Sequence, residues 1–241
     1  MQAVAALANP KRFLDLADAA VPWLGAAAGL VLAAGLYWSL VLAPADYQQG
    51  DAARIMFVHV PAAWMSMFVY AAIAVASLIG LVFKHPLADV AAKAAAPYGA
   101  VFTALALVTG SLWGKPMWGA YWVWDARLTS ELILLFVYLG YIGLWNAIED
   151  PARAAKACAV LALVGAVNIP IIKFSVDWWS TLHQGESIFR SGGPTMSAAF
   201  LWPLFVMALG YTLFFFWLWL MRIRTEILER RLRAALMGAS G

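Results

Sequence analysis

Long apolar runs separated by short polar segments form the main pattern of this chain. A helix needs roughly 20 predominantly apolar residues to cross the hydrocarbon core of a bilayer. Six runs meet that length, at about residues 21–42, 61–83, 96–112, 131–148, 157–173 and 197–221. The pattern therefore predicts an all-α fold, in which residues 1–241 form a single membrane domain with six transmembrane helices.

The composition agrees with a membrane protein. Hydrophobic residues make up 64% of the chain and charged residues 12%, whereas soluble domains contain about 25% charged residues. The first run is followed by Ala43-Pro44-Ala45, which has the shape of a signal-peptide cleavage site. That run is longer than a signal peptide's apolar region and further spans follow it, so we interpret it as an uncleaved helix.

Basic residues predict the orientation, because they are retained on the cytoplasmic side of a membrane. With six spans, the side that holds both termini receives eleven of the 16 lysines and arginines. Both termini are therefore expected in the cytoplasm, and the connections 43–60, 113–130 and 174–196 are expected outside. Membrane anchoring also accounts for the net charge of +3 without a nucleic-acid partner.

Missing motifs exclude several kinds of enzyme. The sequence contains no P-loop and neither of the G-x-S-x-G and H-E-x-x-H motifs. The single cysteine, Cys158, cannot form an intramolecular disulfide and is interpreted as a small buried residue. Charges within the spans are scarce, which argues against an ion-coupled carrier. The chain is thus not expected to drive transport with its own ATP, nor to be an enzyme of these kinds.

Tryptophans are concentrated in the predicted external loop 113–130. This loop contains Trp113, Trp118, Trp122 and Trp124. An interfacial aromatic belt explains the tryptophans elsewhere in the chain but explains this dense cluster poorly. Indole rings provide flat apolar surfaces with one N–H donor each, so the cluster favours a platform for a flat ligand.

Charged residues lie at the end of the same loop. Asp125 either pairs with Arg127 or orients the loop by accepting N–H hydrogen bonds. Glu131 begins the fourth span, where an unpaired charge is costly, so it is expected to have a structural or functional role.

Two histidines are expected on the outer face. His59 precedes Pro61, which favours the first turn of a helix, so the second span is expected to start there. His183 follows the fifth span, beside Trp178 and Trp179. Each could be a simple interfacial polar residue. Together they could instead be the two axial ligands of a haem iron, with Arg54, Arg127 and Arg190 as cations for its propionates.

Two local features predict structure away from this site. Asn168 and Pro170 predict a kink or packing irregularity within the fifth span. Residues 221–237 can continue the sixth helix, with Glu226/Arg230 and Glu229/Arg233 at i,i+4 spacing. This basic tail could be a topological anchor, or it could dock to a cytoplasmic partner or to anionic lipid.

Three motifs, taken in order, resemble a known family. Residues 113–129 resemble the tryptophan-rich WWD signature of haem-handling proteins in cytochrome c biogenesis. The segments RIMFVHVPAAW around His59 and WWSTLHQGES around His183 resemble the histidine motifs of its cytochrome c maturation branch. The resemblance covers residues 20–221 and agrees with the length and the six spans.

The resemblance implies a site and a set of partners. His59 and His183 would bind the iron of a transiently held b-type haem, and residues 113–127 would form the haem platform and a docking surface. The implied setting is the inner membrane of a bacterium, with the functional face in the periplasm. The implied partners are a periplasmic haem chaperone, a cytoplasmic ATPase subunit, a second multi-span membrane subunit and a small one-span subunit.

Alternative functions stay open from the sequence. The cytochrome c synthetase branch shares the tryptophan signature and ligates haem, but its members are longer and richer in histidine. A haem channel across the membrane would require polar or histidine-lined positions within the spans. A structural scaffold with incidental histidines is the remaining alternative.

Overall fold

A computed structural model describes residues 9–239 of the protein, except residues 180, 184 and 186. The helices of the described residues are α2 (Pro10–Tyr37), α3 (Met56–Phe83), α4 (Ala88–Trp118), α5 (Ala126–Ala147), α6 (Pro151–Gly165), α7 (Asn168–Trp178) and α8 (Ala198–Ala239). A π-helical segment, η1 (Trp38–Leu42), extends α2, and a 3-10 segment, η2 (Asp51–Ile55), leads into α3. No strand is assigned in these described ranges, where the sole β-type pairing is the bridge between Asp46 and Gly50.

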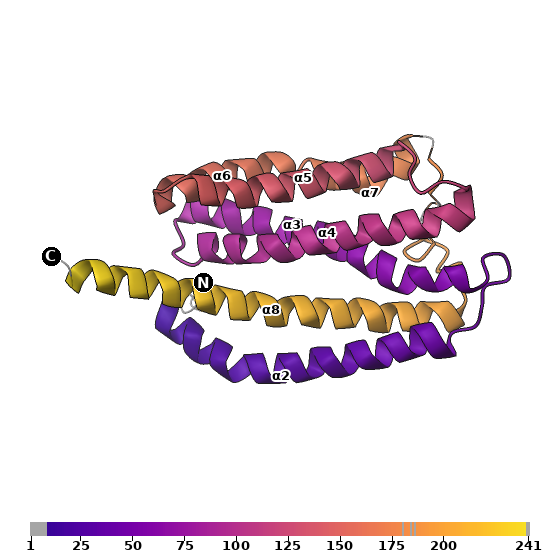
Figure 1. The fold of residues 1–241 in the computed structure, drawn as a ribbon, viewed down its shortest axis with the longest axis horizontal. Helices are drawn as coiled ribbons and strands as arrows, with labels where there is room; N and C mark the ends of the chain where they lie inside the picture. Colours follow the sequence, from indigo (N-terminus) through magenta and orange to yellow (C-terminus); the bar gives the residue numbers. More distant parts are fainter. Residues whose placement is uncertain (1–8, 180, 184, 186, 240–241) are drawn as a thin grey trace.

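The helices form six apolar segments long enough to cross a membrane, with α6 and α7 making up one of them. The all-α fold with six transmembrane helices is therefore confirmed. Figure 1 shows the helices lying nearly side by side, with α2 along α8, α3 beside α4, and α5 to α7 on the far side of that pair. The two described ends of the chain lie at one end of the bundle (Figure 1). The connections after η1, α4 and α7 lie at the opposite end.

The helices are longer than the apolar runs that predicted them. The tryptophan-rich segment shows this most clearly: residues 113–118 form the last turns of α4 and residues 126–130 the first turn of α5. Only residues 119–125 of the predicted loop 113–130 connect the two helices. An apolar run marks only the part of a helix that suits the hydrocarbon core. The backbone hydrogen bonds of the helix continue beyond that part into more polar sequence.

The second membrane helix begins earlier than expected. It starts at Met56, after η2, and Pro61 lies inside α3. Proline lacks an N–H but tolerates helical dihedrals near the first turn, so it does not have to mark the start. As a result, His59 belongs to the first turn of α3 rather than to a loop before it.

The fifth span is interrupted, as Asn168 and Pro170 predicted. Helix α6 ends at Gly165 and α7 begins at Asn168. The Asn168 side chain is buried, and its Nδ2 donates to the Ser130 carbonyl of α5 at 2.8 Å. This hydrogen bond fixes the break against the neighbouring helix.

Tyrosines and small residues form the centre of the bundle. Tyr70 of α3 and Tyr138 of α5 are fully buried, with their rings edge to face at a centroid distance of 5.1 Å. Tyr138 presses against α4 at Gly99, where an added Cβ would lie 2.2 Å from the tyrosine ring. Gly99 is therefore required for the close approach of α4 and α5. Cys158 is fully buried, as expected from the sequence.

An ion cluster around a buried carboxylate joins α8 to α4 at the end that holds the termini. Glu226 is fully buried, and its carboxylate lies 2.7 Å from Lys93 Nζ and 3.0 Å from Arg222 Nη2. The sequence pattern had suggested Arg230 as its i,i+4 partner. Lys93 faces Glu226 because α4 packs against α8, a contact that spacing along one helix cannot indicate.

Candidate functional site

The candidate site lies at the end of the bundle opposite the described termini, where three connections come together (Figure 1). Its two histidines come from different elements. His59 is on α3, and His183 is in the connection between α7 and α8. His59 contacts α4, and His183 contacts residues at both ends of the connection between α4 and α5, as described below.

Asp125 anchors His183. As the N-cap of α5, Asp125 accepts a hydrogen bond from the Leu128 N–H at 2.8 Å through Oδ1. Its Oδ2 lies 2.9 Å from His183 Nδ1 and accepts from Thr181 Oγ1 at 2.7 Å. Of the two roles weighed for Asp125, the structure supports the one in which it orients the loop.

The electrostatics of this pair follow from burial and hydrogen bonding. Burial alone would raise the pKa of Asp125, but hydrogen bonds from Leu128, Thr181 and His183 outweigh burial and lower it. Burial lowers the pKa of His183, although its hydrogen bond and attraction to Asp125 oppose this shift. At neutral pH, Asp125 is thus ionised and His183 is neutral.

The contact with Asp125 leaves the second ring nitrogen of His183 without a proton. A neutral imidazole that faces a carboxylate through Nδ1 carries its proton there and keeps a lone pair on Nε2. Metal-binding histidines commonly have such a carboxylate partner, which fixes the tautomer and raises the basicity of the free nitrogen. Trp118, at the end of α4, lies edge to face against the His183 ring at a centroid distance of 4.9 Å.

His59 has the same arrangement with different partners. Its Nδ1 lies 3.0 Å from the Ala106 carbonyl oxygen and 3.2 Å from Thr109 Oγ1, both on α4. Because a carbonyl only accepts, Nδ1 carries the proton and Nε2 keeps its lone pair. Gly110 makes room for the ring, since an added Cβ there would lie 2.9 Å from His59 Cε1.

Trp113 connects His59 to the first outer connection. The two rings meet edge to face at a centroid distance of 5.7 Å. Trp113 Nε1 donates to Gln49 Oε1 at 2.9 Å, and the Gln49 N–H donates to Asp46 Oδ1 at 2.9 Å. Gln49 and Asp46 were not among the residues expected from sequence, because a polar residue in a short loop carries no sign of its distant partner.

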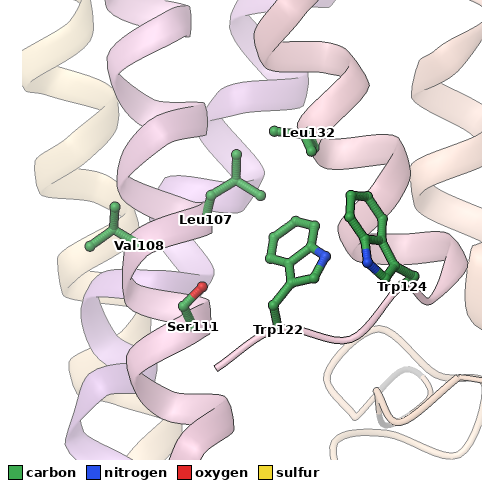
Figure 2. Close-up of a pocket in the computed structure, with 6 residues that line it drawn as sticks. All are labelled: Leu107, Val108, Ser111, Trp122, Trp124 and Leu132. Carbon is green, nitrogen blue, oxygen red and sulfur yellow. The ribbon is translucent and has the colours of Figure 1, made fainter. Parts of the chain in front are cut away.

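The four tryptophans divide into two groups. Trp113 and Trp118 each contact a histidine, whereas Trp122 and Trp124 contact each other at a centroid distance of 5.4 Å. The second pair lines an open apolar groove of about 350 Å³ with side chains of α4 and α5 (Figure 2). Figure 2 shows Trp122 facing Leu107 across this groove, with Trp124 to its side next to α5. Trp124 is 77% exposed, so part of the tryptophan surface faces outward.

Arg127 reaches across the site to α7. Its Nη2 donates to the Lys173 carbonyl at 3.2 Å, and its Nε donates to Ser175 Oγ at 3.3 Å. Its charge is close enough to act on both His59 and His183, which also interact electrostatically with each other. Through its position on α5, Arg127 therefore places a positive charge close to both histidines.

Arg54 holds the first outer connection together. Its guanidinium donates to the carbonyls of Leu40 and Ala43, the latter at 3.1 Å, and its Nε lies 3.2 Å from Asp51 Oδ1. The two hydrogen bonds satisfy backbone carbonyls at the end of η1, which have no partners within the helix. A ligand at Arg54 would have to compete with them. Arg190 is exposed, and its carbonyl accepts from the Gly193 N–H at 3.0 Å.

The arrangement suits a ligand that already has its own metal. Among the described residues, no group of three or more His, Cys, Asp or Glu side chains could hold a bare metal ion. Imidazoles with an Nε2 lone pair are donors of the kind that a haem iron accepts, since the porphyrin supplies its four other ligands. The donor set therefore fits haem.

Fold and site together define a helical membrane protein of six spans with a two-histidine site at one end. The chain belongs to the heme exporter protein C family, whose model matches residues 3–238. It is 62% identical to the heme exporter protein C of Bradyrhizobium diazoefficiens, over 96% of this chain and 88% of that relative. It is 52% identical to the protein of that name from Escherichia coli K12, over 92% of this chain and 89% of the relative. The expected family is confirmed.

Proposed function

We propose that this protein binds haem through His59 and His183 and presents it to a periplasmic haem chaperone during cytochrome c maturation. One observation carries the proposal: both histidines turn Nδ1 toward an acceptor at the same end of the bundle, which leaves both Nε2 lone pairs for a ligand. The names of the relatives, heme exporter protein C, support haem as that ligand.

The two histidines differ as ligands. The Asp125 carboxylate raises the basicity of His183 more than the neutral Ala106 carbonyl raises that of His59. His183 is thus the stronger donor and His59 the more easily exchanged one. This difference suits transient binding of a b-type haem, because handover to a chaperone requires one ligand to leave readily.

The indoles and Arg127 supply the rest of the site. Haem contributes a flat macrocycle with two propionates and an iron that accepts two axial nitrogens. Trp113 and Trp118 pack beside the two ligands, and Arg127 supplies positive charge for a propionate. The exposed Trp122 and Trp124 pair extends the apolar platform toward the chaperone.

The proposed setting is supported by the distribution of the basic residues over the fold. We place both termini in the cytoplasm of a bacterium, since the end of the bundle that holds them also holds most of the lysines and arginines. The site then faces the periplasm across the inner membrane. The protein acts without catalysing a reaction, as one subunit beside a cytoplasmic ATPase, a second multi-span subunit and a small one-span subunit.

The test is the absorption spectrum of the protein purified with its partners from cells that make abundant haem. A Soret band of low-spin haem is expected, and it should weaken in His59→Ala and His183→Ala. His85→Ala is the matched control, because His85 lies at the other end of the bundle and should leave the band unchanged. A colourless wild-type protein, or variants with the full band, would overturn the proposal. Thioether formation by this chain alone would favour a synthetase instead.

A further inference from the structure

A carboxyl group that the site does not use lies buried beneath it. Glu131 of α5 is 7% exposed, within a segment apolar enough to span the membrane. Ser66 of α3 is fully buried, and its hydroxyl donates to Glu131 Oε1 at 2.7 Å. This contact is a buried hydrogen bond between two transmembrane helices.

The hydrogen bond joins the two helices on which the histidine site depends. Ser66 lies about two turns beyond His59 on α3, and Glu131 lies about one and a half turns beyond Asp125 at the start of α5. His59 is one of the two ligands, and Asp125 holds the other, His183. A change in the distance between α3 and α5 at this level would therefore change the spacing of the two ligands.

Neighbouring hydrogen bonds also hold these helices together. Tyr138 of α5 donates from its hydroxyl to the Ser66 carbonyl at 2.7 Å. Asn168 donates to the Ser130 carbonyl at 2.8 Å, which ties α5 to α7, the helix that leads to His183. Helices α3, α5 and α7 thus share one layer of buried polar contacts below the site.

Stability alone does not account for a carboxyl group at this position. A polar or ionisable group within a membrane costs free energy unless it is paired, and an apolar side chain of similar size would fill the same space at lower cost. Ionisable residues inside membrane proteins accordingly tend to be functional. Buried polar contacts in other proteins serve to specify one packing arrangement among several.

We propose that Glu131 is a positioning residue: its hydrogen bond with Ser66 sets the separation of α3 and α5, and through it the spacing of His59 and His183. This inference rests on the proposed haem function. The hydrogen bond between Glu131 and Ser66 does not require Glu131 to be charged. A neutral carboxyl group can donate to Ser66 Oγ while the Ser66 hydroxyl donates to the Ala63 carbonyl, which lies 2.8 Å away.

The test compares Glu131→Gln with Glu131→Leu in the haem-loaded protein. Glutamine keeps a hydrogen-bonding partner for Ser66, so low-spin haem should be retained at wild-type affinity. Leucine removes it, so haem affinity should fall about 10-fold, the lower end of the range for losing a ligand's own hydrogen-bond partner, because Glu131 acts on the ligands only through the helix positions. The remaining haem should shift toward the high-spin, five-coordinate spectrum. Ser66→Ala should reproduce this shift.

Tyr70→Phe is the matched control. Tyr70 lies in the same core, but its hydroxyl donates to the Leu161 carbonyl at 3.4 Å and so joins α3 to α6 instead of α5. This variant should lose some thermal stability and keep the wild-type spin state. A fall in affinity without a change in spin state for Glu131→Leu would indicate general destabilisation and overturn the proposal.

The outcomes separate this inference from the function on which it rests. If the wild-type protein holds no low-spin haem, the proposed function fails. If it does, and Ser66→Ala and Glu131→Leu keep its spectrum and affinity, the positioning role of Glu131 fails. If the leucine variant does not fold, the spectrum and haem affinity of Ser66→Ala alone test the positioning role of Glu131.

Discussion

His183 Nδ1 and Asp125 Oδ2 lie 2.9 Å apart although 58 residues separate them in the sequence. Asp125 belongs to the WWD signature and His183 to the second histidine motif, so this contact joins two of the three motifs in space. It also assigns the proton of His183 to Nδ1. The tryptophan-rich segment therefore holds the His183 ring in place, in addition to presenting a surface.

Replacing Asp125 with asparagine should weaken haem binding by about 10- to 100-fold, the usual cost of losing the partner of a metal-binding histidine. The fold should be little affected, because asparagine is as good an N-cap as aspartate. Haem titration and thermal unfolding measure the two effects separately. Asp150→Asn is the control, since Asp150 caps α6 in the same way, accepting from the Arg153 N–H at 2.7 Å, without contacting a histidine. Equal losses in both variants would contradict a specific role for Asp125.

The free energy of unfolding should depend on pH because the pKa values of His183 and Asp125 are lowered in the folded protein. Because the pKa of His183 is lowered in the folded protein, the unfolded chain takes up its proton first as the pH falls below about 6.5. The free energy of unfolding should therefore decrease from that pH downward, until the folded protein also protonates His183. Asp125, whose pKa is lowered as well, adds a further loss below about pH 4. Denaturant unfolding at several pH values measures this, and a His183→Gln variant should lack the first decrease.

Gly110→Ala should displace the His59 ring. The added Cβ would lie 2.9 Å from His59 Cε1, so the ring must move and its hydrogen bond to Ala106 must lengthen. Haem affinity should fall roughly 10-fold. Gly143→Ala on α5 is the control, because an added Cβ there meets no atom within 4 Å. If the Gly110 variant binds haem like the wild type in a spectroscopic titration, the orientation of His59 proposed above is incorrect.

Glu226→Ala should destabilise the fold without affecting the haem spectrum. It removes the carboxylate that pairs with Lys93 and Arg222, and because these two cations are 27% and 42% exposed and stay partly hydrated, the cost should be about 1–2 kcal/mol, below that of a fully buried pair. Thermal unfolding in detergent should show a lower midpoint. Glu229→Ala, which changes an exposed residue on the same helix, should leave the midpoint unchanged. A stable Glu226→Ala variant would mean that α8 does not depend on this cluster.

The sequence predicted the candidate ligands and singled out Asp125, but it did not predict the other groups that hold the ligands in place. His59, His183 and Asp125 stood out because polar residues beside apolar spans are conspicuous. The Ala106 carbonyl, Thr181 and Gln49 did not, since a carbonyl or a loop hydroxyl looks the same in any protein. The tryptophans were expected to act as one platform, whereas helix geometry directs Trp113 and Trp118 to the histidines and the connection directs Trp122 and Trp124 to a separate groove.

By itself, the sequence determined that this protein is a bundle of six membrane-spanning helices, because the thickness of the hydrocarbon core acts on contiguous residues and leaves a local pattern. It also determined the family, through three motifs in order. Only the tertiary structure decided that Asp125 holds His183, that Glu226 pairs with Lys93, and that Glu131 meets Ser66 across two helices. Each of these contacts depends on which helices pack together and at what rotation, and hydropathy along one chain does not encode either quantity.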